Sequence, residues 1–251
     1  MPETGSDFRS APDNDGVVRS LRDTPPSSGS TTPPSPPAGS SASSTASGSG
    51  GFIMGTINSA ISLVKNPVGY ITTNKDAPAT VRGIMVNYVA VLAAIPFIAT
   101  LIGDLWYYSA FALFGIVGSL WAYVFVYAFL EYILDIIAVY VVAMIIGFLA
   151  KNFGSTADPI KNLKLSAFIF TPAYLAGALN IIPFLGIVEL LGLLYGLYIL
   201  YLGLPIMLNT PKDKVVTYVV AVVIATFIVY FIFAAIIGAI TIAAFHAGIY
   251  Y

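Results

Sequence analysis

Four acidic residues lie within or at the ends of long apolar stretches, where a charged side chain is seldom kept without a role. Glu131 and Asp135 precede Lys151 in one stretch, and their i, i+4 spacing places them on the same helix face. Glu189 lies near the start of another stretch, and Asp104 at the end of the first. A charge at the centre of a bilayer costs about 2.5–3.5 kcal/mol on insertion scales. The four carboxylates therefore form a candidate intramembrane polar cluster.

Two interpretations of this cluster stay open at the level of the sequence. In the first, Glu131, Asp135 and Glu189 converge on a wet cavity and bind a cation or relay protons, with their pKa values raised by like charge and desolvation. In the second, they are neutral or hydrogen-bonded to tyrosines and fix helix packing. The candidate tyrosines are Tyr127, Tyr132 and Tyr195. No internal repeat of the kind common in transporters is evident, which favours the second interpretation.

Signatures of other chemistries are missing from the sequence. There is no cysteine and one histidine, His246, so neither a thiolate nucleophile nor a metal site of the usual kind is expected. We find no HExxH, no glycine-rich phosphate loop and no GxSxG, and we therefore predict a non-enzymatic protein without cofactor or metal. Eleven basic against twelve acidic residues leave no excess positive charge for nucleic acid.

Small residues at helical spacing form a second group of candidates. Gly192 and Gly196 make a GxxxG pattern, and Ala173 with Gly177 makes a similar pair earlier in the chain. Such residues allow helices to approach closely within membranes. They serve either contacts between chains or packing inside one chain, and the sequence alone does not decide between these.

The elements that position these residues are membrane helices. Of the 251 residues, 58% are hydrophobic and 9% are charged, whereas a soluble domain carries roughly a quarter charged residues. A bilayer core needs about 20 apolar residues in a helix. The apolar stretches give five spans, which together make an all-α polytopic bundle. The expected spans are 84–103, 124–149, 164–182, 185–207 and 215–244.

The distribution of basic residues predicts the orientation. A single crossing within 105–150, with a cytoplasmic N-terminus, places all eleven Lys and Arg residues on the cytoplasmic side. The bundle is then expected to be N-in and C-out. Residues 105–123 are too apolar for water, so they re-enter the membrane, lie in its interface or extend a span.

Two segments precede the membrane domain of residues 82–251. Residues 1–51 are rich in Ser, Thr, Pro and Gly, and such a composition predicts a disordered tail. Residues 52–81 are predicted to form a juxtamembrane segment that begins with a short amphipathic helix ending before Pro67. That helix lies either in the membrane interface or on the bundle itself.

Several motifs, in order along the chain, resemble the Yip (Ypt-interacting protein) domain family of five-span membrane proteins. Each motif is weak alone, and the specificity comes from their order and spacing over about 66–240. They comprise Asn66-Pro67, the run Tyr88 to Pro96, the run Phe170 to Gly177 with Thr171 and Pro172, Pro183, the run Gly196 to Pro205 with Gly203, and Asp213-Lys214.

The resemblance implies a role rather than a reaction. Eukaryotic relatives belong to early secretory membranes and associate with Rab-type GTPases and with one another. They carry an Asp-Leu-Tyr-Gly-Pro motif before the first span, which this sequence lacks. The resemblance is therefore to the compact prokaryotic type, without an expectation of GTPase binding. We predict a membrane scaffold or adaptor that forms homo- or hetero-oligomers, in the cell membrane if prokaryotic or the Golgi if eukaryotic. The alternative is a small cation or proton transporter.

Overall fold

The computed structural model describes residues 49–112 and 120–249, and every element in these ranges is a helix. The predicted disordered tail lies outside the described residues, apart from its last three positions. Two short helices come first, α1 (Ser49–Lys65) and α2 (Pro67–Asn74). Asn66 caps α2 by accepting a hydrogen bond from the Gly69 N–H, and Pro67 at the first helical position ends α1 and starts α2.

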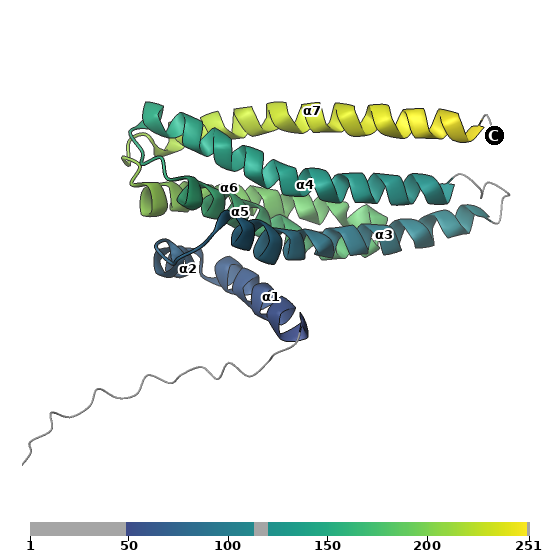
Figure 1. Cartoon of the computed structure of the whole chain (residues 1–251), viewed down its shortest axis with the longest axis horizontal. Helices are drawn as coiled ribbons and strands as arrows, with labels where there is room; N and C mark the ends of the chain where they lie inside the picture. Colours follow the sequence, from purple (N-terminus) through teal and green to yellow (C-terminus); the bar gives the residue numbers. More distant parts are fainter. Residues whose placement is uncertain (1–48, 113–119, 250–251) are drawn as a thin grey trace, which may run out of the picture. The chain divides into compact units, whose positions relative to one another are not determined.

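Five longer helical segments follow and lie lengthwise beside one another (Figure 1). The first consists of a π-helix, η1 (Gly83–Val89), continued by α3 (Ala90–Ala112). The others are α4 (Leu120–Ala150), α5 (Pro159–Ala176), α6 (Ile187–Leu208) and α7 (Val215–Ile249). Short 3₁₀ turns connect them: η2 (Lys151–Phe153) after α4, and η3 (Gly177–Ile181) with η4 (Pro183–Gly186) between α5 and α6.

Four of the described helical segments are long and apolar enough to cross a membrane: 83–109, 124–153, 184–208 and 215–240. The predicted third span, 164–182, corresponds to α5, which has 18 residues and then tightens into η3. Five crossings are therefore not established by length and composition. The apolar residues 105–112 extend α3 and residues 120–123 begin α4, so the described part of this segment extends two helices rather than lying across their ends.

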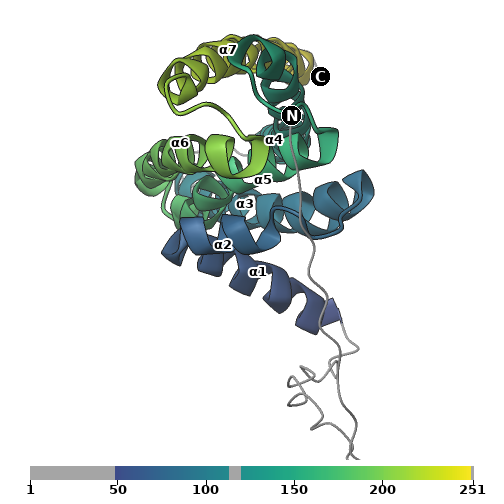
Figure 2. The same ribbon diagram turned by 90° about the vertical axis from the view of Figure 1, so that its left-hand side faces the viewer.

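The central helix is α5, which packs against α3, α4 and α6. Figure 2 shows α7 and α4 on one side of α5 and α6, and α1 and α2 on the other. Almost all of α5 from Asn162 to Tyr174 is buried. Because this helix is surrounded by protein, it can carry polar side chains that find partners inside the bundle: the Ser166 hydroxyl donates to the Val139 carbonyl at 2.6 Å.

Helix α1 packs on the bundle through the face that carries Thr56, Ala60 and Leu63. Ala60 and Leu63 are fully buried, and the Thr56 hydroxyl lies 3.2 Å from the Asn87 carbonyl oxygen. Ile53 and Ile61 remain exposed, as do Phe52 and Met54. A small residue and a leucine fit against the neighbouring helices, while the larger apolar side chains face outward.

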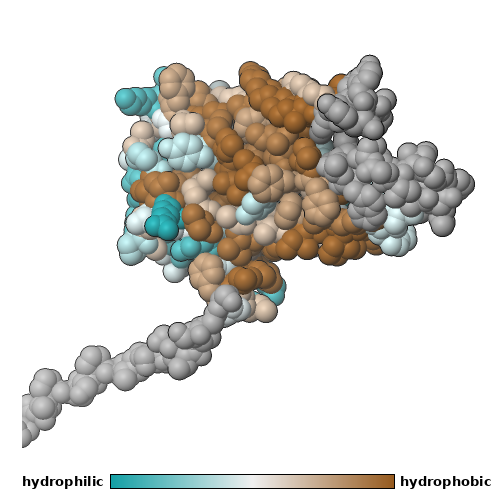
Figure 3. All heavy atoms as spheres, turned by 45° about the vertical axis from the view of Figure 1, so that its right-hand side comes forward, coloured by the Kyte–Doolittle hydropathy of each residue, from teal (hydrophilic) through white to brown (hydrophobic). Residues whose placement is uncertain are grey.

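The outer surface of the spans is strongly apolar (Figure 3). Large aliphatic and aromatic side chains are exposed along α3, α4, α6 and α7. Such a surface suits hydrocarbon rather than water. The described basic residues lie at one end of the bundle, in or near the helix ends and loops there: Lys65, Lys75, Arg82, Lys151, Lys161, Lys164, Lys212 and Lys214.

Candidate functional site

The small residues predicted to pack helices all contact other helices of the same chain. A methyl group added at Gly192 would lie 2.7 Å from the Cα of Ala173, and one at Gly177 would lie 2.6 Å from the Cβ of Pro96. At Gly196 the clash would be with the carbonyl oxygen of Ile169. The GxxxG pattern thus forms the α5–α6 contact within one chain, where two backbones touch.

The motif residues contact one another across the bundle in the same way. The Thr171 hydroxyl donates to the Ala167 carbonyl at 2.8 Å, so its oxygen accepts from the Tyr88 hydroxyl at 2.9 Å. Both Thr171 and Pro172 are buried on α5, and Gly203 of α6 lies against the Leu165 side chain. These residues join η1, α5 and α6. Pro183 begins η4, which turns the chain from α5 toward α6.

Three of the four candidate carboxylates line one small cavity. Glu131 and Asp135 reach it from α4, and Glu189 reaches it from the first turn of α6. Its volume of about 10 Å³ is close to what a single water molecule needs. The fourth carboxylate, Asp104, lies further along α3 and is not among the described residues that line it. The remaining lining residues are Pro96, Phe97, Thr100, Ala128, Tyr132 and Asn180.

Asn180 connects this cavity to three helical segments. Its Nδ2 donates to Glu189 Oε2 at 2.9 Å and to the Thr100 hydroxyl at 3.3 Å. Its Oδ1 is buried and has no hydrogen-bond partner within the part of the chain that the structure describes. The amide therefore holds η3, α3 and α6 together and orients the Glu189 carboxylate.

Two of the tyrosines considered as partners for the carboxylates donate elsewhere. The Tyr132 hydroxyl donates to the Ala90 carbonyl at 3.2 Å, and the Tyr195 hydroxyl donates to the Val64 carbonyl at 2.9 Å. Tyr174 donates to the backbone carbonyl of Asp135 at 3.3 Å and not to its carboxylate. Tyr132, Tyr174 and Tyr195 therefore donate to backbone carbonyls and not to the carboxylates.

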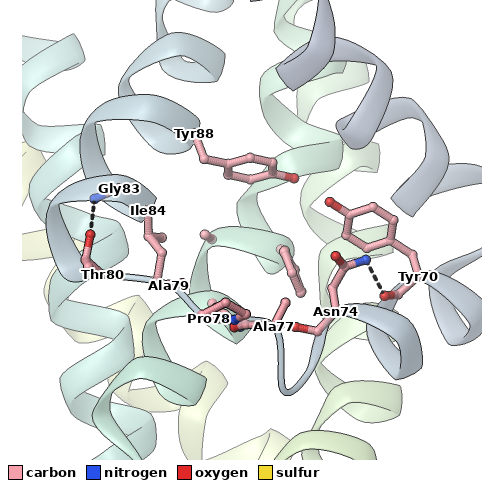
Figure 4. A pocket seen from close by; sticks show the side chains of 12 residues that line it. Tyr70, Asn74, Ala77, Pro78, Ala79, Thr80, Gly83, Ile84 and Tyr88 are labelled. Atoms are coloured by element: carbon pink, nitrogen blue, oxygen red, sulfur yellow. Dashed lines mark hydrogen bonds between the residues drawn. The ribbon is translucent and has the colours of Figure 1, made fainter. Parts of the chain in front are cut away.

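A second and much larger pocket lies at the basic end of the bundle, between α2, the 75–82 loop, η1 and α5. Its volume is about 580 Å³, within the range of about 300–1,000 Å³ typical of ligand sites. Figure 4 shows Tyr70 and Tyr88 with their hydroxyl ends toward each other, Asn74 beside Tyr70, and Thr80 on the other side next to Gly83. Lys164 and Phe168 of α5 complete the lining.

Comparison with known proteins identifies the family. Residues 61–235 match the Yip1 domain, which is more than half of the chain. The chain belongs to the Yip1 domain family. The matched region includes both sites and all the packing residues described above.

Curated relatives of this Yip1 domain protein are bacterial. The inner membrane protein YohC of Escherichia coli K12 is 28% identical over 131 residues, which are 51% of this chain and 67% of YohC. YohC of Escherichia coli O6:H1 matches to the same extent. No solved structure matches. With its apolar helices, the chain is an integral membrane protein.

The residues of the larger pocket have only a weak signature in the sequence. Tyr88 belongs to a family motif, but Tyr70, Asn74 and Thr80 are ordinary residues of a short helix and a loop. In the sequence, Lys164 contributes only to the prediction of orientation, because it is the first residue of the expected span 164–182. Within the described residues there is no group of three His, Cys, Asp or Glu side chains arranged to hold a metal ion.

Proposed function

We propose that this Yip1 domain protein is a non-enzymatic membrane scaffold or adaptor that works by associating with a second copy or with another membrane protein. The membrane domain of residues 82–251 carries the association, and the tail of residues 1–51 extends from it on the cytoplasmic side. Residues 52–81 join the two. GTPase binding is left out, because the motif linked with it in eukaryotic relatives is missing from the sequence.

The observation that supports this proposal is the sparse coverage of α7. In the most apolar part of this helix only 6% of the residues are buried, against 22–33% in the other three apolar spans. Val215, Tyr218 and Val222 attach its first two turns to the bundle, and beyond them large side chains face outward. Because its own chain covers so little of α7, the surface of this helix is available to a helix of another chain. Helices associate in lipid through such close packing.

Crosslinking in native membranes tests the proposal. Because the chain has no cysteine, a single cysteine at Ile228, which is 58% exposed on α7, gives one defined attachment point. We expect a bis-maleimide reagent to capture a covalent dimer or one defined membrane protein, identified by mass spectrometry. The matched control is Val222→Cys on the same helix, which is 2% exposed and should capture nothing. Monomer alone from Ile228→Cys contradicts the proposal.

A second candidate function rests on the three carboxylates that meet at one cavity. Glu131, Asp135 and Glu189 come from two helices, and no Lys or Arg is among the described residues that line the cavity. Such a group supports proton or cation transfer through a membrane. Reconstituted flux in vesicles at varied pH should fall when any one of the three is changed to Gln or Asn. Asp104→Asn serves as the control that leaves flux unchanged.

The two candidates predict opposite sensitivities. A scaffold keeps its partner when the three carboxylates are neutralised, whereas a transporter loses flux. Absence of flux in the unaltered protein would exclude the transporter.

A further inference from the structure

The larger pocket combines a buried positive charge with an apolar wall, and neither proposed function uses it. It lies at the start of the first apolar span, where η1 begins at Gly83 and the 75–82 loop crosses toward α5 (Figure 4). This is the level at which a span leaves hydrocarbon for the headgroup region. Its rim residues Ala77, Pro78 and Thr80 are exposed, so the pocket is accessible from outside.

Lys164 supplies the charge. It is only 7% exposed, and its Nζ donates to the Asn74 carbonyl at 3.1 Å and to the Ala77 carbonyl. Both acceptors are neutral, and an ammonium group has three N–H donors, so one donor and the full positive charge remain for a ligand. Asp76, the acidic side chain of this loop, pairs instead with Lys161 at 2.6 Å and lies 3.9 Å from Lys75.

The wall beside Lys164 is apolar and aromatic. Ile84 of η1 and Phe168 of α5 are buried there, and the rings of Tyr70 and Tyr88 lie edge-on to Phe168 at 5.5 and 6.2 Å. Because the Tyr88 hydroxyl donates to Thr171, it offers the pocket only an acceptor oxygen. A fully hydrated anion does not match this wall, whereas a ligand with a charged head and an apolar body does.

The surroundings favour a negatively charged ligand. The charged side chains around the pocket have a positive excess of two: four are basic (Lys75, Arg82, Lys161 and Lys164) and two are acidic (Asp76 and Asp158). Asp158 is already engaged, because its carboxylate caps α5 by accepting from the N–H groups of Ile160 and Lys161. Basic pockets between membrane helices at the headgroup level are typical binding places for acidic lipids.

The geometry points to a binding site for the phosphate-bearing headgroup of an anionic phospholipid. Lys164 contacts the phosphate, the Tyr88 oxygen accepts from a headgroup hydroxyl, and the wall of Ile84 and Phe168 covers the first methylenes of the lipid. The π-helix helps to form the site, since its wider turn carries Gly83, Ile84 and Tyr88 to the pocket. Such insertions in helices are frequent at functional sites.

Lipid titration of the full-length protein in neutral detergent tests the inference. The probes are dioctanoyl phosphatidylglycerol, dioctanoyl phosphatidylcholine and inorganic phosphate, and the readouts are native mass spectrometry and the shift in melting temperature. Phosphatidylglycerol should bind saturably and at least about tenfold more tightly than phosphatidylcholine, because the quaternary ammonium of choline offsets the phosphate charge beside Lys164 and choline has no hydroxyl to donate to Tyr88. Inorganic phosphate should bind far more weakly, since it leaves the apolar wall uncovered.

Three variants locate the binding. Lys164→Met removes the charge, and Ala77→Trp fills the pocket while keeping the lysine; each should weaken phosphatidylglycerol binding by about tenfold or more. Lys212→Met removes a charge of the same sign from an exposed position in the loop before α7, outside the pocket lining, and should stay within about twofold of the unaltered protein. If Lys164→Met fails to fold because two carbonyls lose their donor, Ala77→Trp still tests the inference, since Ala77 is an exposed residue of the pocket lining.

Several results would overturn the inference. Unchanged phosphatidylglycerol binding by Ala77→Trp would place the lipid elsewhere on the protein. Equal binding of phosphatidylcholine would remove the recognition of negative charge. Inorganic phosphate binding as tightly as phosphatidylglycerol would make the pocket a site for a soluble anion and not for a lipid.

Discussion

At the scale of single residues, the contacts between α5 and its neighbours depend on side chains that are absent or small. Gly192 and Gly196 of α6 meet the backbone of α5 at Pro172, Ala173 and Ile169. Where backbone faces backbone, neither side can move away by changing a rotamer. Residues at these contacts therefore set the distance between two central helices.

Gly196→Ala should destabilise the protein by about 1–3 kcal/mol, because overpacking at a backbone contact forces the two helices apart. The free energy of unfolding, measured on the monomer in mixed detergent micelles, gives the result. Gly55→Ala is the matched control: a methyl group there meets nothing within 4 Å, and alanine suits a helix interior better by about 0.5–1 kcal/mol. An unchanged monomer stability with loss of oligomers would instead assign Gly196 to a contact between chains.

The sequence could predict that these glycines pack helices, but it could not identify the partner. A GxxxG pattern indicates that another helix packs closely against this one. That helix can belong to the same chain or to another chain. The same limit applies to Glu131 and Asp135: their shared face follows from their spacing, whereas their distance from Glu189 depends on how α4 and α6 are placed. The role of Lys164 could not be predicted from residue spacing, because its hydrogen-bond partners are backbone carbonyls of a loop.

At the scale of elements, the helix that is most buried is not the one that is most apolar. The most buried helix, α5, is missing from the four segments that qualify as spans by composition, while the very apolar α7 is the least covered. Lipid requires an apolar surface, whereas a helix enclosed by protein can satisfy polar groups internally, as Ser166 does. A hydropathy scan therefore detects the outside of such a bundle more readily than its centre.

The attachment of α7 depends on Tyr218. This residue is fully buried, its ring stacks on Phe153 at 4.5 Å, and its hydroxyl donates to the Ile146 carbonyl of α4. Tyr218→Ala should cost about 3 kcal/mol, the lower end of the range for removing a buried aromatic ring, and should increase cleavage of the 209–214 loop by added protease. Tyr230→Ala, on the same helix but 66% exposed, should change stability by less than about 0.5 kcal/mol. Equal effects of the two changes would contradict this attachment.

The ion pair between Asp76 and Lys161 ties the 75–82 loop to α5 and predicts a dependence on pH. The hydrogen bond from Lys161 lowers the pKa of Asp76 below its ordinary value of 3.8, and the same bond raises the pKa of Lys161 above 10.5. The contribution of Asp76 is therefore complete above pH 3.8 and is lost as the pH falls through its lowered pKa. That of Lys161 is complete below pH 10.5 and is lost as the pH rises beyond it.

Comparison with Asp76→Asn isolates this contribution from other titrating groups. The unaltered protein should be more stable than the variant at pH 7, by a small margin because Asp76 is exposed to solvent and Lys161 is partly exposed. The difference should vanish as the pH falls well below 3.8. The measurement is the melting temperature of both proteins over pH 2.5–7. Steps of about 0.5 pH unit suffice to follow one titration. Asp213→Asn, in the loop before α7, is the control, and a gap that persists at the lowest pH would assign the effect to packing.

At the scale of the whole molecule, charge is separated along the bundle. The eight described basic residues occupy one end, while Asp104, Glu131, Asp135 and Glu189 lie toward the other. The positive-inside rule predicts that the basic end lies in the cytoplasm, and we propose that the five long segments alternate across the membrane in an N-in, C-out arrangement. The decisive element is α5, since its crossing determines on which side the turn at 177–186 lies.

Single-cysteine labelling settles both the orientation and the number of crossings. The protein lacks cysteine, so Lys212→Cys at the basic end and Ala178→Cys in η3 each introduce one reactive thiol at an exposed position. In intact cells a membrane-impermeant maleimide should label Ala178→Cys and spare Lys212→Cys until the membrane is opened. Lys151→Cys, exposed in η2 just before α5, adds the test of that helix. If α5 did not cross, Lys151→Cys and Ala178→Cys would lie on one side of the membrane and label together, with Lys212→Cys on the other side. Labelling of Lys151→Cys and Lys212→Cys without Ala178→Cys would reverse the orientation and place the phospholipid pocket in the opposite leaflet, where basic residues meet fewer acidic lipids.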